Sequence, residues 1–550
     1  MTPSRIYLRK RLNAHITSLL SSALMGLMVS TAPALAADAQ SIDDLFGSPP
    51  PAKKPKPKAA PPAPATEAQS IDDLFGSPSP AAKKPATATP AQVVAPQQTA
   101  TPEEKVAPQA HPSPAVATPT QQASPIGEAA TAPSPDLAET SAESQDEPAH
   151  LKVSGFLQTD LAYIFAGTKH WSNFNNTLDL STQGSTTNGI GWKLSGRVNY
   201  NPIYNLTDFY PSSVGDDQTF EAMFRETYID LGAGDWEFRL GRQDIVWGEM
   251  VGVFVADAVS AKDLRQFILP DLDMIRIPQW AARGEYFSGD FHAEAVWIPY
   301  MTYDNIGVPG MDFYPFTPPA VPGFQTVIAD EQQPQGLGDS AYGGRLSWIK
   351  DGWDVSGFYY STNDMTPAFS RQISLSTITY TPIHKRIYQL GATLGKDLGP
   401  MVLKAEALYS RDKLISTLDP LDTDGLVKQN IFDYIVGLEW SFPQETRFNV
   451  QFFQRWFPDY NPDIVADELN SGVSMLLSTQ ALHPKLEPEI LLLSSLNRVD
   501  WMAQFKLAWK PGGNWRVETG LAFFGGSAGS GLFGDFDNND QIYTNVRYSF

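Results

Sequence analysis

The residues best suited to chemistry in this sequence are charged side chains that recur at alternate positions in residues 151–550. Alternate residues of a strand face the same side, so these charges would share one face of a sheet. Such a face suits the wall of a water-filled channel, where fixed charges tune the selection of solutes. Acids and bases nearly balance, and each residue could instead form a cross-strand ion pair that only stiffens the wall. The predicted pore-lining residues are Lys193, Arg197, Glu237, Arg239, Arg283, Glu285, Glu294, Arg345, Lys404, Glu406, Arg447, Arg455, Arg516 and Arg547.

Enzymatic chemistry has little support. The chain has no cysteine and only seven scattered histidines, and it lacks a nucleophile elbow, a phosphate-binding loop and a zinc-binding helix. His292 lies near Glu294, where a polar lining role is the plainer interpretation. Residues 535–540 alternate oxygen-bearing side chains as a calcium loop does, but the turn glycine and the distal glutamate are missing. We predict no catalytic residue, no cofactor and no metal site.

One long segment, Val251–Trp280, is too apolar for a loop that lies in water, since it carries residues such as Phe254 and Phe267. We predict that it folds into the channel and forms the constriction, with a short helix over residues 257–269. The alternative is an external cap that packs on neighbouring loops. The predicted constriction residues are Lys262, Asp263 and Arg265.

The elements that must position these residues are strands. Apolar and polar residues alternate over 192–200, 433–442, 499–509 and 542–550, and a period of two predicts strands with one apolar face. The strands are long enough to cross an outer membrane when tilted. Tryptophans beside the turns are typical of interfacial belts; they are Trp236, Trp348, Trp353, Trp440, Trp509 and Trp515. The predicted fold class is all-β, a transmembrane antiparallel β-barrel.

The connections between strands alternate between short turns and long loops, which allows a count. We expect three strands within residues 151–200 and thirteen from residue 219 onward. The total is about 16, with 14 and 18 as the neighbouring counts, and bacterial barrels of this kind have even numbers. The apolar segment 458–498 is predicted to be a long loop that extends strands above the membrane.

The N-terminal part differs from the barrel. Residues 1–36 have a positively charged start, an apolar stretch and a small-residue cleavage site, which predicts a signal peptide. Residues 37–150 hold 22 of the 45 prolines and no Trp or Tyr. We predict a disordered Pro/Ala-rich linker in the periplasm.

The linker contains a repeat, because residues 39–49 recur unchanged at 68–78 with the core Ser-Ile-Asp-Asp-Leu-Phe-Gly. Two copies of one docking peptide would raise avidity through effective concentration. The alternative is a recent duplication in unconstrained sequence. The partner would be a periplasmic protein or peptidoglycan. The predicted docking residues are Ile42, Leu45, Phe46, Ile71, Leu74 and Phe75.

The formal net charge of −21 argues against a nucleic-acid partner, which would require a basic face. Beyond the N-terminus no apolar run is long enough for a helical membrane span. The expected surroundings are therefore lipid, reached through strands.

Two sequence features carry a resemblance. The C-terminal Tyr548-Ser549-Phe550 resembles the signal that outer-membrane barrels present to the barrel assembly machinery. The stretch Gly241–Glu249 resembles a Gly-Arg-Gln…Trp-Gly-Glu motif of an uncharacterised proteobacterial outer-membrane β-barrel family, distantly like the alginate-export and phosphate-selective porins. The resemblance covers about residues 150–550 and implies a porin-like channel of 16 or 18 strands, without a defined substrate.

These observations predict a porin-like channel in the outer membrane of a Gram-negative bacterium, with the linker in the periplasm as a tether for partner docking. The alternative is a non-conducting outer-membrane anchor whose linker performs the function. A third possibility, an outer-membrane hydrolase, lacks a nucleophile next to a histidine.

Overall fold

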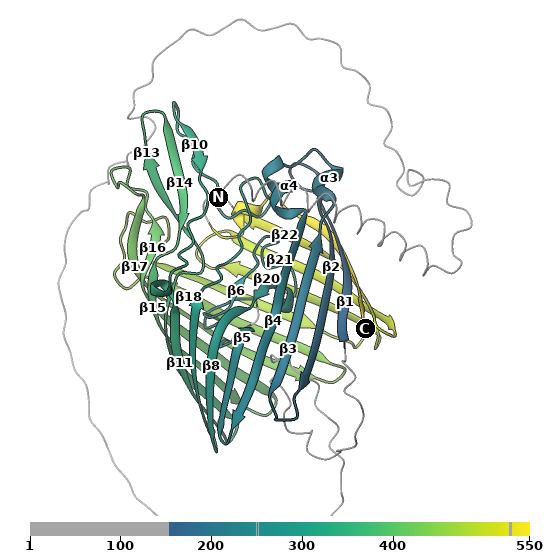
Figure 1. Cartoon of the computed structure of the whole chain (residues 1–550). Helices are drawn as coiled ribbons and strands as arrows, with labels where there is room; N and C mark the ends of the chain where they lie inside the picture. The colour runs from purple at the N-terminus through teal and green to yellow at the C-terminus, as the bar shows by residue number, and fades with distance from the viewer. Residues whose placement is uncertain (1–152, 249, 251, 527–530) are drawn as a thin grey trace, which may run out of the picture. The chain divides into compact units, whose positions relative to one another are not determined.

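The computed structural model describes residues 153–248, 250, 252–526 and 531–550. The predicted signal peptide, linker and docking repeats lie outside the described residues and stay predictions. Eighteen strands join into one antiparallel sheet (Figure 1). They are β1 (Val153–Ile164), β2 (His170–Ser185), β3 (Gly191–Tyr200), β4 (Phe220–Ala233), β5 (Trp236–Gln243), β8 (Gln279–Ser288), β9 (Phe291–Tyr300), β11 (Ala341–Lys350), β12 (Trp353–Asn363), β15 (Arg386–Asp397), β16 (Met401–Ser416), β17 (Leu426–Phe442), β18 (Thr446–Trp456), β19 (Leu469–Ser478), β20 (Leu486–Ser495), β21 (Asp500–Gly512), β22 (Trp515–Gly526) and β23 (Gln541–Ser549).

The sheet closes on itself because its first strand pairs with its last. β1 and β23 run antiparallel with Phe156 opposite Ser549. Gly155 and Phe550 exchange two backbone hydrogen bonds of 2.9 Å. A closed sheet has no free edge, so its backbone groups are satisfied within the barrel. The predicted all-β closed antiparallel barrel is confirmed.

The predicted best count of 16 strands is wrong, although the observed 18 lies at the upper end of the predicted range. The difference falls in residues 458–498, which we expected to be a loop. They contain β19 and β20, which pair with each other and with β18 and β21. The turn between them, residues 479–485, contains Pro484 but no glycine, so only part of the usual turn signal is present.

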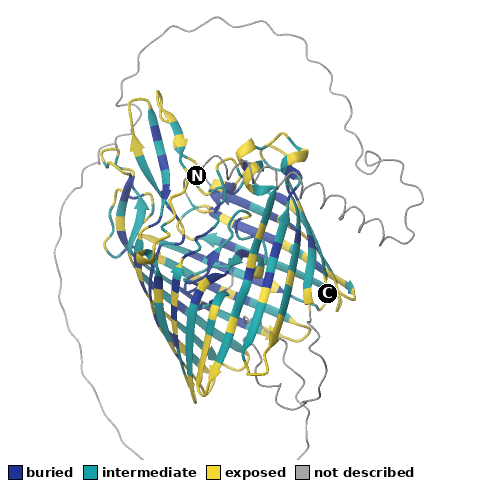
Figure 2. Cartoon of the chain, viewed as in Figure 1, coloured by how far each residue is buried: buried dark blue, intermediate teal, exposed yellow. Residues whose placement is uncertain are grey.

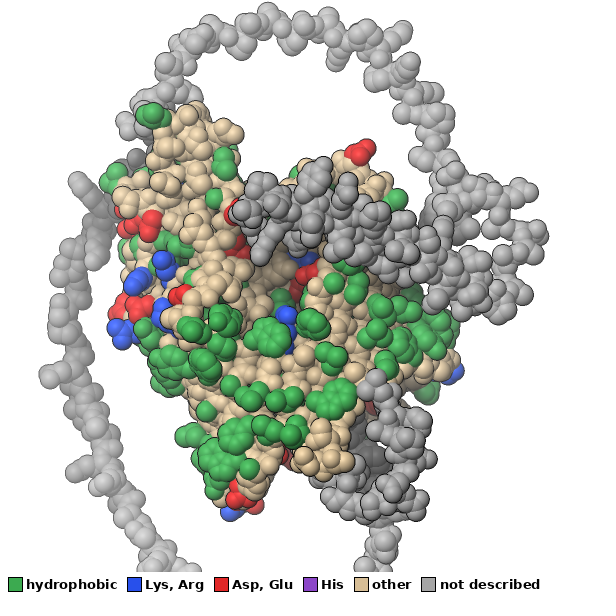
Figure 3. All heavy atoms as spheres, viewed as in Figure 1, with side chains coloured by type: hydrophobic (Ala, Val, Ile, Leu, Met, Phe, Trp, Pro, Cys, Tyr) green, Lys and Arg blue, Asp and Glu red, His purple; other side chains and the backbone are tan. Residues whose placement is uncertain are grey.

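Alternation divides most of the strand residues between an outer and an inner face. On β12, Trp353, Val355 and Tyr359 are exposed, whereas Phe358 and Tyr360 are buried. Figure 2 shows this mixture of buried and exposed positions along the strands. Figure 3 shows hydrophobic side chains spread over the visible wall. Exposed large hydrophobic side chains also occur on β1, β5, β15, β18 and β23, so the apolar outer face continues around the barrel.

The longer connections carry small elements. They are α3 (Ile203–Leu206), α4 (Ser212–Gln218), β6 (Ala261–Lys262), α5 (Leu272–Ile275), β7 (Arg276–Ile277), β10 (Gln325–Ile328), β13 (Ala368–Ile373) and β14 (Thr377–Ile383). The strands β10, β14 and β13 form a separate sheet that projects beyond the barrel (Figure 1). Within the described part of the chain, every helix is too short or too polar to cross a bilayer.

Candidate functional site: the barrel interior

The connection between β5 and β8, residues 244–278, is here called the inserted loop; its residues 249 and 251 are not described. It begins at the Gly-Arg-Gln motif. Gly241 has a φ of 134°, and a Cβ there would lie 2.3 Å from the carbonyl oxygen of Thr227. Gln243 is fully buried, and its Nε2 donates to the carbonyl of Ala281 on β8 at 3.1 Å. The motif therefore fixes the point where the chain leaves the wall.

The first half of the inserted loop packs on the wall through Trp247. This side chain is buried against Phe358 and Tyr360 of β12, with ring centroids 4.9 and 5.7 Å away. Its indole N–H donates to Glu294 Oε2 of β9 at 3.1 Å. The next residue, Gly248, has no room for a side chain, because a Cβ would lie 2.6 Å from the backbone nitrogen of Asp257. The Trp-Gly pair therefore serves close packing.

One wall carboxylate also holds the backbone of the inserted loop. Glu406 of β16 accepts hydrogen bonds from the N–H groups of Met250 at 3.1 Å and Ala256 at 2.8 Å. Glu406 is buried, and both donor residues belong to a buried apolar cluster that includes Leu408 and Ile435 of the wall. A buried carboxylate needs such donors to offset its lost hydration. Glu406 therefore contributes to loop position rather than to an open wall.

The second half of the inserted loop ends in an aromatic cluster. Phe267, in a left-handed conformation with φ of 55°, contacts Phe313 of the next long loop and Phe536 of the last one. Phe524 of β22 completes this contact. A left-handed φ costs about 1 kcal/mol or more for a bulky residue, and the surrounding rings stabilise it. Three long connections are thus joined inside the barrel mouth.

The predicted helix over residues 257–269 is wrong. The segment is extended at β6, and its backbone bonds go to another loop: Leu264 N–H donates to the carbonyl of Asn305, and Asn305 N–H donates to the carbonyl of Lys262. Val259 and Ala261 are fully buried. Burial against neighbouring segments outweighs local helix propensity here.

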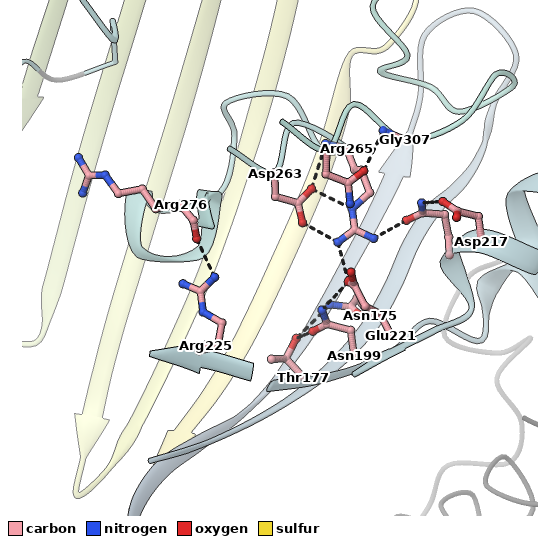
Figure 4. Close-up of polar contacts among 12 residues, drawn as sticks. Asn175, Thr177, Asn199, Asp217, Glu221, Arg225, Asp263, Arg265, Arg276 and Gly307 are labelled. Carbon is pink, nitrogen blue, oxygen red and sulfur yellow. Dashed lines mark hydrogen bonds and ion pairs between the residues drawn. The ribbon is translucent and has the colours of Figure 1, made fainter. Parts of the chain in front are cut away.

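Of the three predicted constriction residues, two lie together. Arg265 binds Asp263 and also Glu221 at the start of β4, with an Nη2–Oε2 distance of 2.8 Å. Its Nη1 donates to Gln218 at 2.8 Å, and Asn199 of β3 donates to Glu221 at 3.3 Å (Figure 4). We call Asp263, Arg265 and Glu221 the Arg265 bridge. It connects the inserted loop to the wall on the side of β3 and β4.

The third residue, Lys262, points elsewhere. Its ammonium group donates to the carbonyls of Asp257 at 3.0 Å and Ser260 at 3.2 Å. It also lies 5.0 Å from the centroid of the Phe254 ring. The contacts of its ammonium group are therefore within the inserted loop, whereas its backbone binds Asp304 and Asn305 of the next long loop.

Two cavities lie beside the Arg265 bridge. The first, of about 150 Å³, is lined by β1–β4, β22, β23 and the inserted loop. The second, of about 440 Å³, is lined by β3, β4, β5 and long connections. Both include Arg197, Asn199, Glu221, Asp263 and Met274 in their linings. The bridge therefore belongs to the partition between them.

Most of the predicted pore-lining charges form ion pairs in the wall. Arg239 binds Asp230 through two nitrogens at 2.7 and 3.0 Å, and Arg283 binds both Glu285 and Glu294. The other ion pairs are Lys193–Glu226, Arg197–Asp179, Lys404–Glu439, Arg447–Glu439, Arg455–Asp433 and Arg516–Glu518. These contacts agree with the stiffening role that we kept as an alternative, and solute selection stays a prediction.

Three further predicted lining residues have other surroundings. Arg345 donates to the hydroxyl of Ser356 at 3.1 Å. Arg547 donates to Gln158 Oε1 at 2.5 Å and forms an ion pair with Asp273 of the inserted loop at 3.7 Å. Glu237 is exposed beside the short turn that joins β4 to β5.

The sequence analysis missed Glu221, which a shift of register explains. On β4, Glu221 and Arg225 lie at alternate positions and face the same side of the sheet. The register of the pairing with β3 shifts between Leu194 and Gly196, and beyond this irregularity Glu226 and Asp230 form a second alternating set. Strict period two assigns only one of these sets to the interior. A pairing irregularity has no reliable signature in one sequence.

Several carboxyl groups of the long connections have shifted pKa values. Burial raises the pKa of Asp304 and of Asp244, with partial offset from Lys262 and Arg225 respectively. Burial acts in the same direction on Asp271, but Lys506 at 3.3 Å, with Arg516, outweighs it and lowers the pKa. Asp271 is therefore held as a carboxylate against β21. In the described ranges no three His, Asp or Glu side chains are grouped as metal ligands.

Eighteen antiparallel strands that close around an inserted loop define a large single-chain β-barrel. The chain belongs to the DUF1302 family, described as "Protein of unknown function", whose model matches residues 151–550. The predicted membership of an uncharacterised barrel family is supported, whereas the likeness to alginate-export and phosphate-selective porins stays a prediction. No curated protein matches the chain.

Several solved structures are similar to the chain. Acinetobacter baumannii OccAB1 is 9% identical, with 72% of this chain and 95% of that chain covered and a TM-score of 0.46. Pseudomonas aeruginosa OccK8 (OprE) is 12% identical, with 72% and 97% covered and a TM-score of 0.44. Salmonella typhi OmpF, in a complex with daunomycin, is 10% identical, with 73% and 97% covered and a TM-score of 0.39.

Proposed function

We propose that the protein is a porin-like channel that lets a solute cross the outer membrane. The observation that carries this proposal is the pair of polar cavities beside the Arg265 bridge. The inserted loop buries its apolar residues against β8, β9, β11, β12, β16, β17 and β19–β22. The side that faces β1–β4 and β23 keeps polar linings. A passage along this side would have one ionic contact, Arg265 to Glu221, at its narrowest part.

The outer surface supports a position in lipid. Trp501 and Trp509 are both exposed on β21. Eight residues of strand span about 26 Å along the strand, which is about 20 Å across the membrane at a tilt of about 40°. Both rings would therefore lie near the edges of an apolar band about 25 Å tall, where outer-membrane barrels have aromatic girdles. Exposed Trp236, Trp348 and Trp515 lie next to short turns, as a girdle requires. The localisation is therefore proposed to be the outer membrane of a Gram-negative bacterium.

In the proposed mechanism the solute diffuses between a paired, charged wall and the polar side of the inserted loop. The wall ion pairs leave little net field, so hydrogen bonds and size contribute most of the selection. The Arg265 side chain must separate from Glu221 for a larger solute to pass, while Asp263 keeps the guanidinium on the loop.

The alternative function is a non-conducting anchor. It is favoured by the large buried core between the inserted loop and the wall, which includes Trp247 and Tyr360 and resembles a plug rather than a flexible gate. Planar-bilayer recordings of the mature chain separate the two functions. A steady ionic current supports the channel, and silence of correctly inserted protein supports the anchor.

The tether is a separate part of the proposal. Residues 37–150 would extend into the periplasm and dock a protein or peptidoglycan through the two repeats. A peptide of residues 39–78 should capture its partner, and a peptide with Phe46→Ala and Phe75→Ala should not. Equal capture by both peptides would remove the docking proposal and leave the channel untouched.

A further inference from the structure

The first cavity has an unusual lining, since most of its polar side chains are uncharged. Nine of its 31 lining residues are Asn or Gln, compared with six acids and three arginines. The amides come from adjacent strands, for example Gln158 on β1, Asn175 on β2, Asn199 on β3 and Asn545 on β23. Alternation brings them to one inner face. A solute in this cavity therefore meets groups that both donate and accept hydrogen bonds.

The charged groups of the cavity are largely engaged. Its three arginines all have partners: Arg197 binds Asp179, Arg265 binds Asp263 and Glu221, and Arg547 binds Gln158. An anion would have to displace a bound carboxylate or amide. Acids outnumber the arginines in the lining, which is a further disadvantage for an anionic solute.

Most of the carboxyl groups that line the cavity also have hydrogen-bond or ion-pair partners. Glu518 binds Arg516, and Asp271 binds Lys506 at 3.3 Å. Asp312 accepts hydrogen bonds from His170 and from the hydroxyl of Tyr210. Asp160 accepts one from Gln158 at 2.8 Å. A cation would therefore compete with existing donors at nearly every carboxylate.

By contrast, two amides are free to bind a solute. Within the described structure, the side chains of Gln266 on the inserted loop and Asn545 on β23 make no hydrogen bond. The rings of Tyr204, Tyr210 and Phe313 are also part of the lining. Aromatic faces pack well against the C–H surfaces of sugar rings, while amides pair with their hydroxyl groups.

We propose that the solute class is a neutral, hydroxyl-rich molecule such as a sugar or polyol, recognised by the amide-lined wall of the first cavity. This inference rests on the proposed channel function. The mechanism is binding and release: hydroxyl groups exchange water for the amides of Gln266 and Asn545, and no charge has to be removed from its partner. Selection against ions then follows from the occupied ion pairs.

The test compares three probes with one carbon skeleton: glucose, gluconate and glucosamine. The mature full-length chain is reconstituted in liposomes, and the initial efflux of each labelled probe is measured at physiological salt. We expect glucose to leave about fivefold faster than either ion, the effect of roughly one net hydrogen bond. Equal or faster efflux of gluconate or glucosamine would overturn the inference.

A variant pair locates the effect. Gln266→Met combined with Asn545→Leu keeps side-chain volume but removes the free amides, and it should slow glucose efflux about fivefold. Gln372→Met changes an exposed amide on β13, away from the cavity, and should have no effect.

Unchanged glucose efflux in the double variant would also overturn the inference. Lack of any KCl conductance would overturn the channel itself, whereas conductance without glucose preference would overturn only the solute class.

Discussion

The indole N–H of Trp247 donates to Glu294 at 3.1 Å, and both side chains are buried. Trp247 belongs to the inserted loop and Glu294 to β9. This single contact therefore joins the loop to the wall at a point where water cannot replace the bond. A lost buried hydrogen bond costs about 1–3 kcal/mol, because the remaining acceptor is left without its donor.

Trp247→Phe should loosen the inserted loop. The ring still fills most of the site, but Glu294 loses one donor and keeps, among the described residues, the ion pair with Arg283 at 2.8 Å. We expect unfolding in detergent at a lower temperature and a noisier single-channel current. Trp509→Phe, on the outer face, is the matched control and should change neither measurement.

Arg265→Gln should widen the proposed passage. The variant removes the ion pair with Glu221 while it keeps a polar side chain of similar reach. We expect conductance to rise roughly twofold in planar bilayers, since the charge contact at the narrowest part is gone. Glu221→Gln should have a similar effect, and the double variant should add little to either single one. Additive effects would mean that the two residues act independently.

Gly248→Ala should destabilise the protein. The added methyl group would lie 2.6 Å from the nitrogen of Asp257, and overpacking of this kind costs about 1–3 kcal/mol. Thermal unfolding followed by gel mobility measures the loss. Gly232→Ala is the control, because a Cβ there meets no atom within 4 Å. Equal stability of both variants would contradict the close packing at the Trp-Gly pair.

The contact between Asp271 and Lys506 predicts a pH dependence at the acid end. Burial opposes ionisation of Asp271, but Lys506 and its neighbours lower the pKa below the ordinary 3.8. The stabilising contribution of a lowered carboxyl pKa is complete above the unfolded value and is lost as the pH falls through the folded one. Fluctuations of the channel current caused by a loosened inserted loop should therefore appear only below about pH 4. The Asp271→Asn variant should show the same current fluctuations at pH 7. A variant whose current at pH 7 is as steady as that of the unaltered protein would contradict this assignment.

Much of the fold was predictable from the sequence, because period-two alternation and aromatic residues at turns are local signals. The same signals are weaker where a turn lacks glycine. Residues 479–485 join β19 to β20 with Pro484 but no glycine, and the whole apolar segment was therefore interpreted as one long loop. The predicted number of strands was nevertheless even, because overlooking one turn removes two strands from the count.

The site was less predictable because its contacts join segments far apart in the chain. Arg265 could be singled out by its place in an apolar loop, but its partner Glu221 lies before a slip in strand pairing. The failed helix over 257–269 has a similar cause, since Asn305 supplies the backbone partners of that segment. Such distant pairings are properties of the assembled barrel rather than of local sequence.

The pairing of Gly155 with Phe550 has a consequence for biogenesis. The first strand finds its second neighbour only after β23 has been synthesised, roughly 380 residues later, so ring closure depends on a contact of very high sequence separation. Until that moment β1 exposes an unsatisfied edge that could pair with other chains. Assembly of this protein should therefore require a factor that shields the first strand while the last one arrives.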